Sequence, residues 1–234
     1  MKTFKLSPSA INLMLECPRC FWLHHNQKIR RPSSIFPSLP SGMDRVLKEH
    51  FDKFMEKGKL PPELCENHEC KNLKLFDNKE LLSVWRNNFK GISFKDSQGN
   101  ELHGAVDNIL MKIKGKKKIL IVLDYKTRGF PLKEDTAEHY QNQLDTYNFL
   151  LEKNGYETED YGFLLFYVPK EVMATGEVIF DTELVKMKVD VDSAEKVWKK
   201  ALKLLNGECP ELKKQEEECV WCKMVEGERG SRKS

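Results

Sequence analysis

Long hydrophobic runs are absent from this sequence. The longest apolar stretches, such as residues 119–123, fall far short of the roughly 20 residues that a membrane-spanning helix needs. The opening residues, MKTFKLSPSA, also lack the apolar core of a secretory signal peptide. We therefore expect a cytoplasmic protein that makes no use of a membrane.

A strong excess of either charge is lacking as well. The chain has 39 lysines and arginines against 36 acidic residues, which gives a net charge of +3. A basic coat for nucleic acid is therefore not indicated, and any such contact must come from local patches. No internal repeat is present. With 40% hydrophobic residues, the 234 residues suffice for one domain with its own core.

Cysteine is present in an odd number. In a reducing compartment, seven cysteines favour metal ligation or free thiols over a disulfide framework. Four of them form two C-x2-C pairs, Cys17 with Cys20 and Cys219 with Cys222, a spacing at which two thiolates can share one metal. Four unrelated thiols are the simpler interpretation, but two such pairs seldom arise by chance.

Periodicity and capping signals predict an alternation of helices and strands. Helices are expected at residues 7–17, 43–58, 137–155 and 192–207, a loop at 30–42, a strand hairpin at 101–126, and further strands at 161–169 and 177–191. This order is typical of an α/β domain with a mixed β-sheet.

Two opposite charges end the most apolar of the predicted strands. Asp124 and Lys126 follow the run ILIVL and point to the same face, because side chains alternate along a strand. Asp107, on the preceding strand, can lie across from them. Two carboxylates this close repel unless a cation lies between them, and oxygen ligands suit Mg²⁺ or Mn²⁺. The alternative is a surface Lys–Asp pair with an unrelated Asp107, which so apolar a strand disfavours.

Two helices offer further candidates. His50 lies on the apolar stripe of the predicted helix 43–58, where a lone histidine is usually a core residue. Imidazole would nevertheless supply a third ligand for Mn²⁺ or Mg²⁺. Gln143 and Tyr147 are four residues apart, so they share one helix face and could hold a phosphate or orient Lys126.

Taken in order, these segments resemble the motifs of the PD-(D/E)XK nuclease superfamily. The match comprises His50, GAVD ending at Asp107, DYK at residues 124–126, and QLDTY at residues 143–147. Within the superfamily the match is to the RecB-like branch, which adds the helical His50 and the Gln-x-x-x-Tyr motif of Gln143 and Tyr147. The segment SPSAINLMLECPRCFWL is also similar to the N-terminal segment of CRISPR-associated RecB-like exonucleases and AddB-type nucleases. One departure is Val106, where the superfamily's name implies proline.

The resemblance covers most of the chain and implies a fold. We expect a restriction-endonuclease-like core with a mixed β-sheet flanked by helices, an N-terminal helical region, and a Cys-ligated metal cluster that joins the termini. One nuclease domain would span residues 1–234, with a helical part at 1–98, the nuclease core at 99–190, and a C-terminal helix and cysteine segment at 191–234.

The resemblance also implies roles for the site residues. The Mg²⁺ or Mn²⁺ ion would be bound by His50, Asp107, Asp124 and the main-chain carbonyl of Tyr125. Lys126 would position the attacking water, with Gln143 and Tyr147 completing the catalytic set. Arg128, close to Lys126, is the expected phosphate contact together with Tyr147. Nothing resembles a base-reading motif, so cleavage should tolerate any sequence.

A [4Fe–4S] cluster is the cofactor that the resemblance implies for the cysteines. The usual pattern has one N-terminal and three C-terminal cysteines, the last lying beyond the final C-x2-C. No cysteine follows Cys222, so the fourth ligand beside Cys17, Cys219 and Cys222 must be Cys20 or Cys209. A structural Zn²⁺ bound by two C-x2-C pairs stays open as the alternative.

The sequence thus predicts a divalent-metal-dependent DNA nuclease. It would act as an exonuclease on single- or double-stranded DNA ends, in DNA repair, recombination or CRISPR adaptation, with a helicase or CRISPR-adaptation protein as partner. The alternative is a non-catalytic DNA-binding or assembly module stabilised by a Cys₄ metal site. The intact set of His50, both aspartates and Lys126 argues against that alternative.

Overall fold

The structure, a computed structural model, describes residues 2–32, 38–211 and 219–222. Its internal contacts divide the chain into two compact units. Unit 1 consists of Met1–Phe36, Lys95–Leu102 and Glu195–Ser234, and unit 2 consists of Pro37–Phe94 and His103–Ala194. The expectation of one domain over residues 1–234 stays a prediction.

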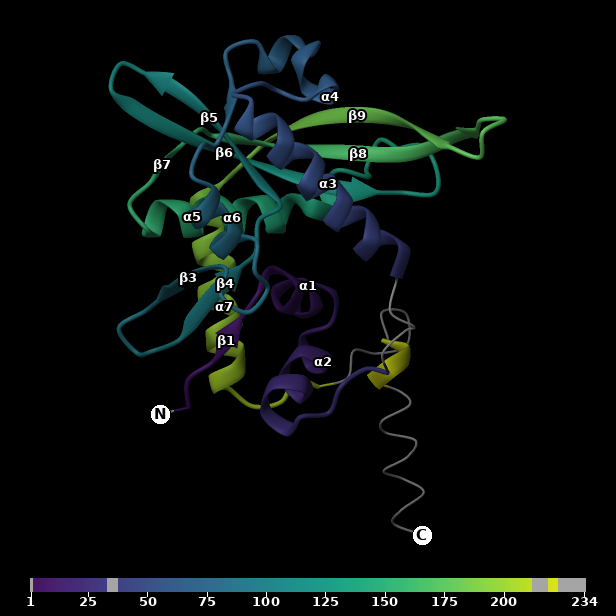
Figure 1. Ribbon diagram of the computed structural model, residues 1–234. Helices are drawn as coiled ribbons and strands as arrows, with labels where there is room; N and C mark the ends of the chain where they lie inside the picture. Colours follow the sequence, from purple (N-terminus) through teal and green to yellow (C-terminus); the bar gives the residue numbers. More distant parts are fainter. Residues whose placement is uncertain (1, 33–37, 212–218, 223–234) are drawn as a thin grey trace. The chain divides into compact units, whose positions relative to one another are not determined.

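A six-stranded mixed sheet forms the centre of unit 2 (Figure 1). The strands follow the order β2-β5-β6-β8-β9, and β7 pairs with β6 in parallel. Their bounds are β2 (Lys74–Leu75), β5 (Asn108–Lys114), β6 (Lys117–Thr127), β7 (Glu157–Thr158), β8 (Tyr161–Val172) and β9 (Val178–Lys188). β5 with β6 and β8 with β9 are antiparallel, whereas β6 and β8 are parallel. The predicted α/β class with a mixed, helix-flanked sheet is confirmed.

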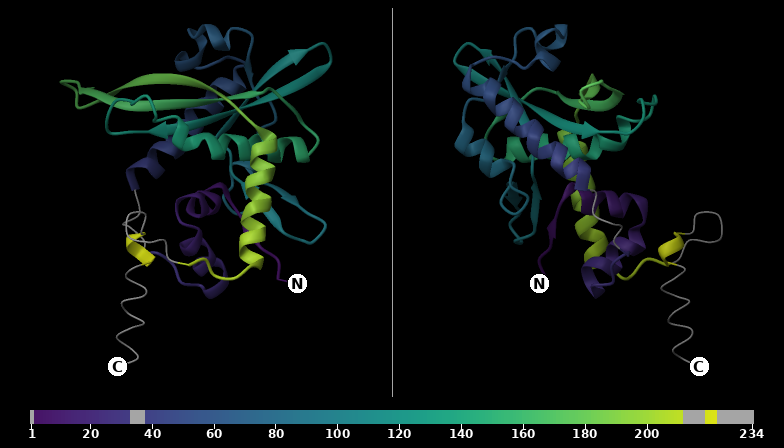
Figure 2. Two further views of the ribbon diagram at one scale, coloured as in Figure 1. Left: turned by 180° about the vertical axis from the view of Figure 1, so that it is seen from behind. Right: turned by 45° about the vertical axis from the view of Figure 1, so that its right-hand side comes forward.

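Helices cover both faces of this sheet (Figure 2). On one face, Phe51 of α3 (Ser38–Glu56) is fully buried in a core that includes Leu123 and Tyr125 of β6. Because side chains alternate along β6, Asp124 and Lys126 face the other way. There Lys126 meets Gln143 of α6 (Gln141–Lys153), which follows the short 3₁₀ helix η3 (Glu138–Tyr140).

Shorter elements complete the path between α3 and β5. They are α4 (Pro62–Cys65), the 3₁₀ helix η2 (His68–Cys70), α5 (Lys79–Trp85), β3 (Ile92–Lys95) and β4 (Glu101–Gly104). Leu64 of α4 and Cys70 of η2 are fully buried in the same core as Phe51. They help to close the apolar layer on the α3 face of the sheet.

Unit 1 contains the first helices and most of the last one. Its elements are β1 (Lys5–Leu6), α1 (Pro8–Glu16), α2 (Pro18–Trp22), the π-helix η1 (Leu23–Gln27) and α7 (Val191–Asn206). Ser7 Oγ accepts a hydrogen bond from Ala10 N at 3.3 Å, which confirms the predicted start of the first helix. Trp22 Nε1 donates to Gly207 O at 2.9 Å, so the N-terminal helices are tied to the end of α7.

The segment ELHGAVDNILMKI, predicted as one strand, is broken in two. β4 ends at Gly104 and β5 begins at Asn108. At Gly104 a Cβ would lie 2.6 Å from the Tyr147 ring, and Val106 N donates to Trp85 O at 3.2 Å, away from the strands of the sheet. The chain therefore turns here, and Asp107 immediately precedes β5.

The loop predicted for residues 30–42 is wrong for residues 38–42. α3 already begins at Ser38 and includes Pro40. Proline is tolerated in a first helical turn, because amide groups there have no helical partner. Residues 33–37 lie outside the described part. None of the described helices is long and apolar enough to cross a membrane.

Candidate active site

β6 carries an ion pair on the face that it turns toward α6. Asp124 is almost completely buried, and its carboxylate pairs with the Lys126 ammonium. β6 lies between β5 and β8, with Asp124 opposite Leu164, so apolar strands surround the charges. Burial of this kind excludes water and fixes both side chains.

Asp107 reaches the same place from the start of β5. Its Oδ2 accepts a hydrogen bond from Tyr125 N at 2.9 Å, and its main-chain oxygen accepts one from Arg86 Nε at 2.7 Å. The register pairs Asn108 with Leu123, which brings Asp107 beside Asp124. The two carboxylates therefore converge as the sequence predicts.

Gln143 of α6 connects these groups. Its Nε2 donates to Asp124 Oδ1 at 3.2 Å and to the Tyr147 hydroxyl at 2.8 Å. Its Oε1 accepts a hydrogen bond from Lys126 Nζ at 3.1 Å. The four-residue spacing of Gln143 and Tyr147 therefore does place both on one helix face, turned toward β6.

The electrostatics of the cluster follow from its burial. Burial first, and then the neighbouring Asp107, raise the pKa of Asp124 to about 7. Burial alone would lower the pKa of Lys126, but the Asp124 carboxylate outweighs it and raises that pKa. Lys126 is therefore an ammonium group at neutral pH, and the carboxylate pair would gain from a further cation.

The arrangement of these carboxylates and the lysine agrees with the protein family whose model matches this chain. The family model described as the PD-(D/E)XK nuclease superfamily matches residues 5–226. The chain belongs to the PD-(D/E)XK nuclease superfamily. Members are typically metal-dependent nucleases, which makes a divalent metal and DNA the expected cofactor and substrate.

Curated proteins and solved structures add no further assignment to the family match. No curated protein matches this PD-(D/E)XK chain. A solved structure described as "Crystal structure of SSO0001" is similar over 88% of this chain and 79% of that chain, with 14% identity and a TM-score of 0.45.

A third carboxylate, which the sequence analysis missed, faces the PD-(D/E)XK site from α3. The Lys48 ammonium lies 2.8 Å from the Asp44 carboxylate and 3.0 Å from Asp107 Oδ1. Burial raises the pKa of Asp44, and the nearby Asp107 raises it further against the effect of Lys48. The signal in the sequence was weak, because an Asp and a Lys four residues apart are ordinary on an exposed helix face.

His50 has different neighbours. Its Nε2 lies 3.1 Å from Glu63 Oε1, which also accepts a hydrogen bond from the Tyr167 hydroxyl at 3.0 Å. Within the described residues, His50, Asp107 and Asp124 do not form a group whose ligand atoms all lie within 4.8 Å of one another. The same is true of Asp44 with the two aspartates, since Lys48 and Lys126 lie among them. The predicted role of His50 as a metal ligand stays a prediction.

Tyr125 precedes Lys126 on β6, and Arg128 comes directly after the end of that strand. Arg128 Nε is buried and has no hydrogen-bond partner in the described part of the chain, while Arg128 N donates to Tyr167 O at 3.0 Å. The Tyr125 hydroxyl accepts a hydrogen bond from Asn108 Nδ2 at 2.6 Å, which anchors its ring on the α3 face. The predicted roles of Arg128 toward DNA and of the Tyr125 carbonyl toward metal stay predictions.

The cysteines of unit 1 form a compact quartet. Cys17, Cys20, Cys219 and Cys222 place their sulfurs within 4.8 Å of one another. Cys209 is not part of it, because its sulfur contacts Arg19 Nη1 and Pro210 O, each at 3.7 Å. Of the two candidates for the fourth position, the structure thus places Cys20 in the group.

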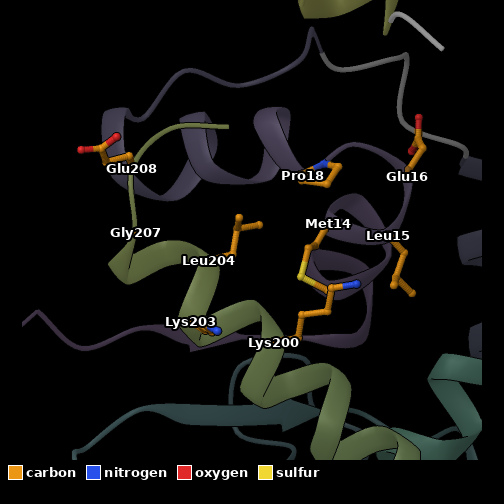
Figure 3. Close-up of a pocket in the computed structure, with 9 residues that line it drawn as sticks. All are labelled: Met14, Leu15, Glu16, Pro18, Lys200, Lys203, Leu204, Gly207 and Glu208. Atoms are coloured by element: carbon orange, nitrogen blue, oxygen red, sulfur yellow. The ribbon is translucent and has the colours of Figure 1, made fainter. Parts of the chain in front are cut away.

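Unit 1 also contains a hollow of about 630 Å³ (Figure 3). Side chains of α1 and α7 line much of it, among them Met14, Leu15 and Leu204, with Lys200 and Lys203 at its edge. None of its lining residues belongs to the carboxylate cluster. The hollow therefore shares no residue with the candidate active site.

Proposed function

We propose that this chain is a divalent-metal-dependent DNA nuclease that hydrolyses phosphodiester bonds with little sequence specificity. The observation that carries the proposal is the convergence of Asp107, just before β5, and Asp124 of β6, with the Lys126 ammonium beside them. Two carboxylates favour a divalent cation, and an adjacent ammonium favours a reacting phosphate. Membership of the superfamily supports the same conclusion.

Each group would then have a distinct task. Asp107 and Asp124 would hold Mg²⁺ or Mn²⁺, together with the main-chain carbonyl of Tyr125. Such an ion lowers the pKa of a bound water and neutralises charge on the phosphate. Lys126 keeps its proton, because its pKa is raised, and would donate a hydrogen bond to the water or to a phosphate oxygen. Gln143 is hydrogen-bonded to both the Lys126 ammonium and the Asp124 carboxylate, and so fixes their positions relative to each other.

The third side-chain ligand is better assigned to Asp44 than to His50. Asp44 shares the Lys48 ammonium with Asp107, so a short side-chain movement would bring both carboxylates to one ion. His50 is engaged with Glu63, whose other contact is Tyr167. Carboxylate oxygen is also the harder ligand and suits Mg²⁺.

The finer assignment is to the RecB-like branch, with exonuclease action at single- or double-stranded DNA ends. The contact between Gln143 and Tyr147 supports it, because these residues form the motif that distinguishes the branch. The unpartnered Arg128 Nε supports a phosphate contact two residues beyond Lys126. The protein would then act in DNA repair or CRISPR adaptation, with a helicase or an adaptation protein as its partner.

A cleavage assay tests the proposal. Anaerobically purified protein is incubated with end-labelled linear and with circular single- and double-stranded DNA, in Mn²⁺, Mg²⁺ or EDTA. We expect cleavage of linear DNA in either metal and none in EDTA, with circles resistant if the action is exonucleolytic. Cleavage of circles would refute exonuclease action alone.

Matched variants identify the site. Asp124→Asn keeps the side-chain shape and should reduce cleavage at least a hundredfold, because a charged ligand is lost. Asp77→Asn is the control, since Asp77 is exposed and pairs with Lys118. If folded wild-type protein binds DNA but cuts none of these substrates, the non-catalytic module is the better description.

A further inference from the structure

The cysteine quartet of unit 1 has sulfurs at separations that can be compared with known metal centres. The Cys17 and Cys222 sulfurs are 3.6 Å apart, those of Cys20 and Cys219 are 3.6 Å apart, and those of Cys20 and Cys222 are 3.3 Å apart. All four lie within 4.8 Å of one another. The quartet is thus close to a small tetrahedron of sulfurs.

The centre of that tetrahedron fits one ion. A regular tetrahedron with edges near the observed contacts has its centre about 2.2 Å from each corner, close to the roughly 2.3 Å of a zinc–thiolate bond. The four sulfurs are thus already gathered at the spacing that one tetrahedral ion requires.

An iron–sulfur cube does not fit the same space. In [4Fe–4S] each thiolate binds a different iron, and the whole cube lies between the four cysteine sulfurs. Those sulfurs must then stand much farther apart than four ligands of a single ion. Four sulfurs within 4.8 Å of one another, three pairs of them at 3.3–3.6 Å, leave no volume for four irons and four sulfides.

The surroundings of the quartet suit a closed structural site. Both pairs are C-x2-C, and Cys20 N lies 3.4 Å from the Cys17 sulfur as a donor. Arg31 Nη2 donates to the Cys219 sulfur at 3.3 Å, so a positive group offsets part of the thiolate charge. Four thiolates with no open position are typical of structural zinc.

We propose that Cys17, Cys20, Cys219 and Cys222 bind a single tetrahedral Zn²⁺ ion, and not a [4Fe–4S] cluster. The ion stabilises unit 1 and takes no part in cleavage. The inference is independent of the proposed nuclease activity, because it rests on none of the carboxylates.

Metal analysis tests the assignment. The Asp124→Asn variant is used, so that metal bound by the carboxylates is reduced, and it is purified anaerobically from cells supplied with both iron and zinc. We expect one zinc per chain and no acid-labile sulfide. Four irons with four sulfides, or one iron without sulfide, would overturn the proposal.

Thiol titration supplies a second readout that does not require a variant of any cysteine in the quartet. A mercurial reagent is added to the native protein while released zinc is followed with a chromophoric chelator. One zinc should be released as four thiols react, and Cys209→Ser should leave that ratio unchanged, because Cys209 lies outside the quartet. A Cys209→Ser protein without zinc would overturn the assignment of the four ligands.

Discussion

The side chain of Lys126, near the end of β6, is fixed by several neighbouring groups. Its ammonium pairs with Asp124, donates to Gln143 Oε1 at 3.1 Å and lies 4.5 Å from the centre of the Tyr140 ring. Three different groups thus fix one cation. A rigid cation of this kind stabilises charge that develops in a transition state without reorganising first.

Replacing Lys126 by alanine should therefore reduce turnover with little loss of metal affinity. Removal of one charge-stabilising donor typically costs a hundredfold to a thousandfold in rate, or about 2.7 to 4 kcal/mol. Single-turnover cleavage measures the rate, and calorimetry with Mn²⁺ measures the affinity. Lys118→Ala is the control, because Lys118 is exposed. Near-normal cleavage by Lys126→Ala would reduce Lys126 to an ion-pair partner of Asp124.

Substitutions of Asp44 and of His50 are expected to have opposite effects on metal affinity. Asp44→Ala should weaken Mn²⁺ binding at least tenfold, since it removes a carboxylate that faces Asp107. His50→Ala should leave Mn²⁺ affinity nearly unchanged and lower the melting temperature, because it removes the partner of Glu63. Calorimetric titration and thermal unfolding of both variants measure these effects. The reverse pattern of metal affinities would restore His50 as the ligand.

The sequence predicted part of this site well. The contacts among Asp107, Asp124, Lys126 and Gln143 depend on strand alternation and on helical spacing, which are local and regular. Asp44 could not be found in that way, because its contact with the site depends on how α3 crosses the sheet. No spacing within the helix itself encodes that crossing.

At the scale of elements, the break between β4 and β5 frees the backbone of Asp107 from the sheet, so that its main-chain oxygen can accept the hydrogen bond from Arg86 Nε. A continuous strand through residues 101–113 would pair Asp107 as an ordinary sheet residue. Gly104 permits the turn, because Tyr147 occupies the space of a side chain there. The apolar pattern of the segment hid this break, since the packing partner lies on α6, far away in the sequence.

Gly104→Ala should accordingly impair both stability and cleavage. The added methyl group would lie 2.6 Å from the buried Tyr147 ring, which must move and disturb its hydrogen bond from Gln143. Overpacking of this kind typically costs about 1–3 kcal/mol. Gly42→Ala is the control, because Gly42 lies in α3 with open space around it and alanine favours helix. Urea unfolding measures the stability of both variants, and cleavage rates measure their activity. A Gly104→Ala protein as active as Gly42→Ala would show that the close contact between Gly104 and Tyr147 is unimportant for cleavage.

At the scale of the whole molecule, the cysteine quartet joins segments that are remote in the chain. Cys17 and Cys222 are 205 residues apart. Closing a loop of that length with a covalent link is worth on the order of 5 kcal/mol in the loop-entropy model. The two C-x2-C pairs made the quartet predictable, whereas the division into two units was not, because it depends on long-range contacts.

Cys222→Ser should therefore destabilise the protein more than any substitution in the carboxylate site. Loss of one ligand releases or weakens the metal, and that binding energy is largely folding energy. Differential scanning calorimetry should show a lower melting temperature for Cys222→Ser and an unchanged one for Cys209→Ser. If Cys222→Ser has the same melting temperature as the wild type, the quartet does not stabilise unit 1.

The interleaving of the two units sets an order of events during synthesis. Every strand of the six-stranded sheet lies between residues 74 and 188, so all of these strands leave the ribosome before residues 219–222 do. Cys17 and Cys20 leave the ribosome early but must wait for residues 219–222 before the quartet can form. During that interval they are unprotected thiols. The quartet can therefore be completed only after every strand of the sheet has been synthesised, which makes it the last long-range contact among the described residues to become available.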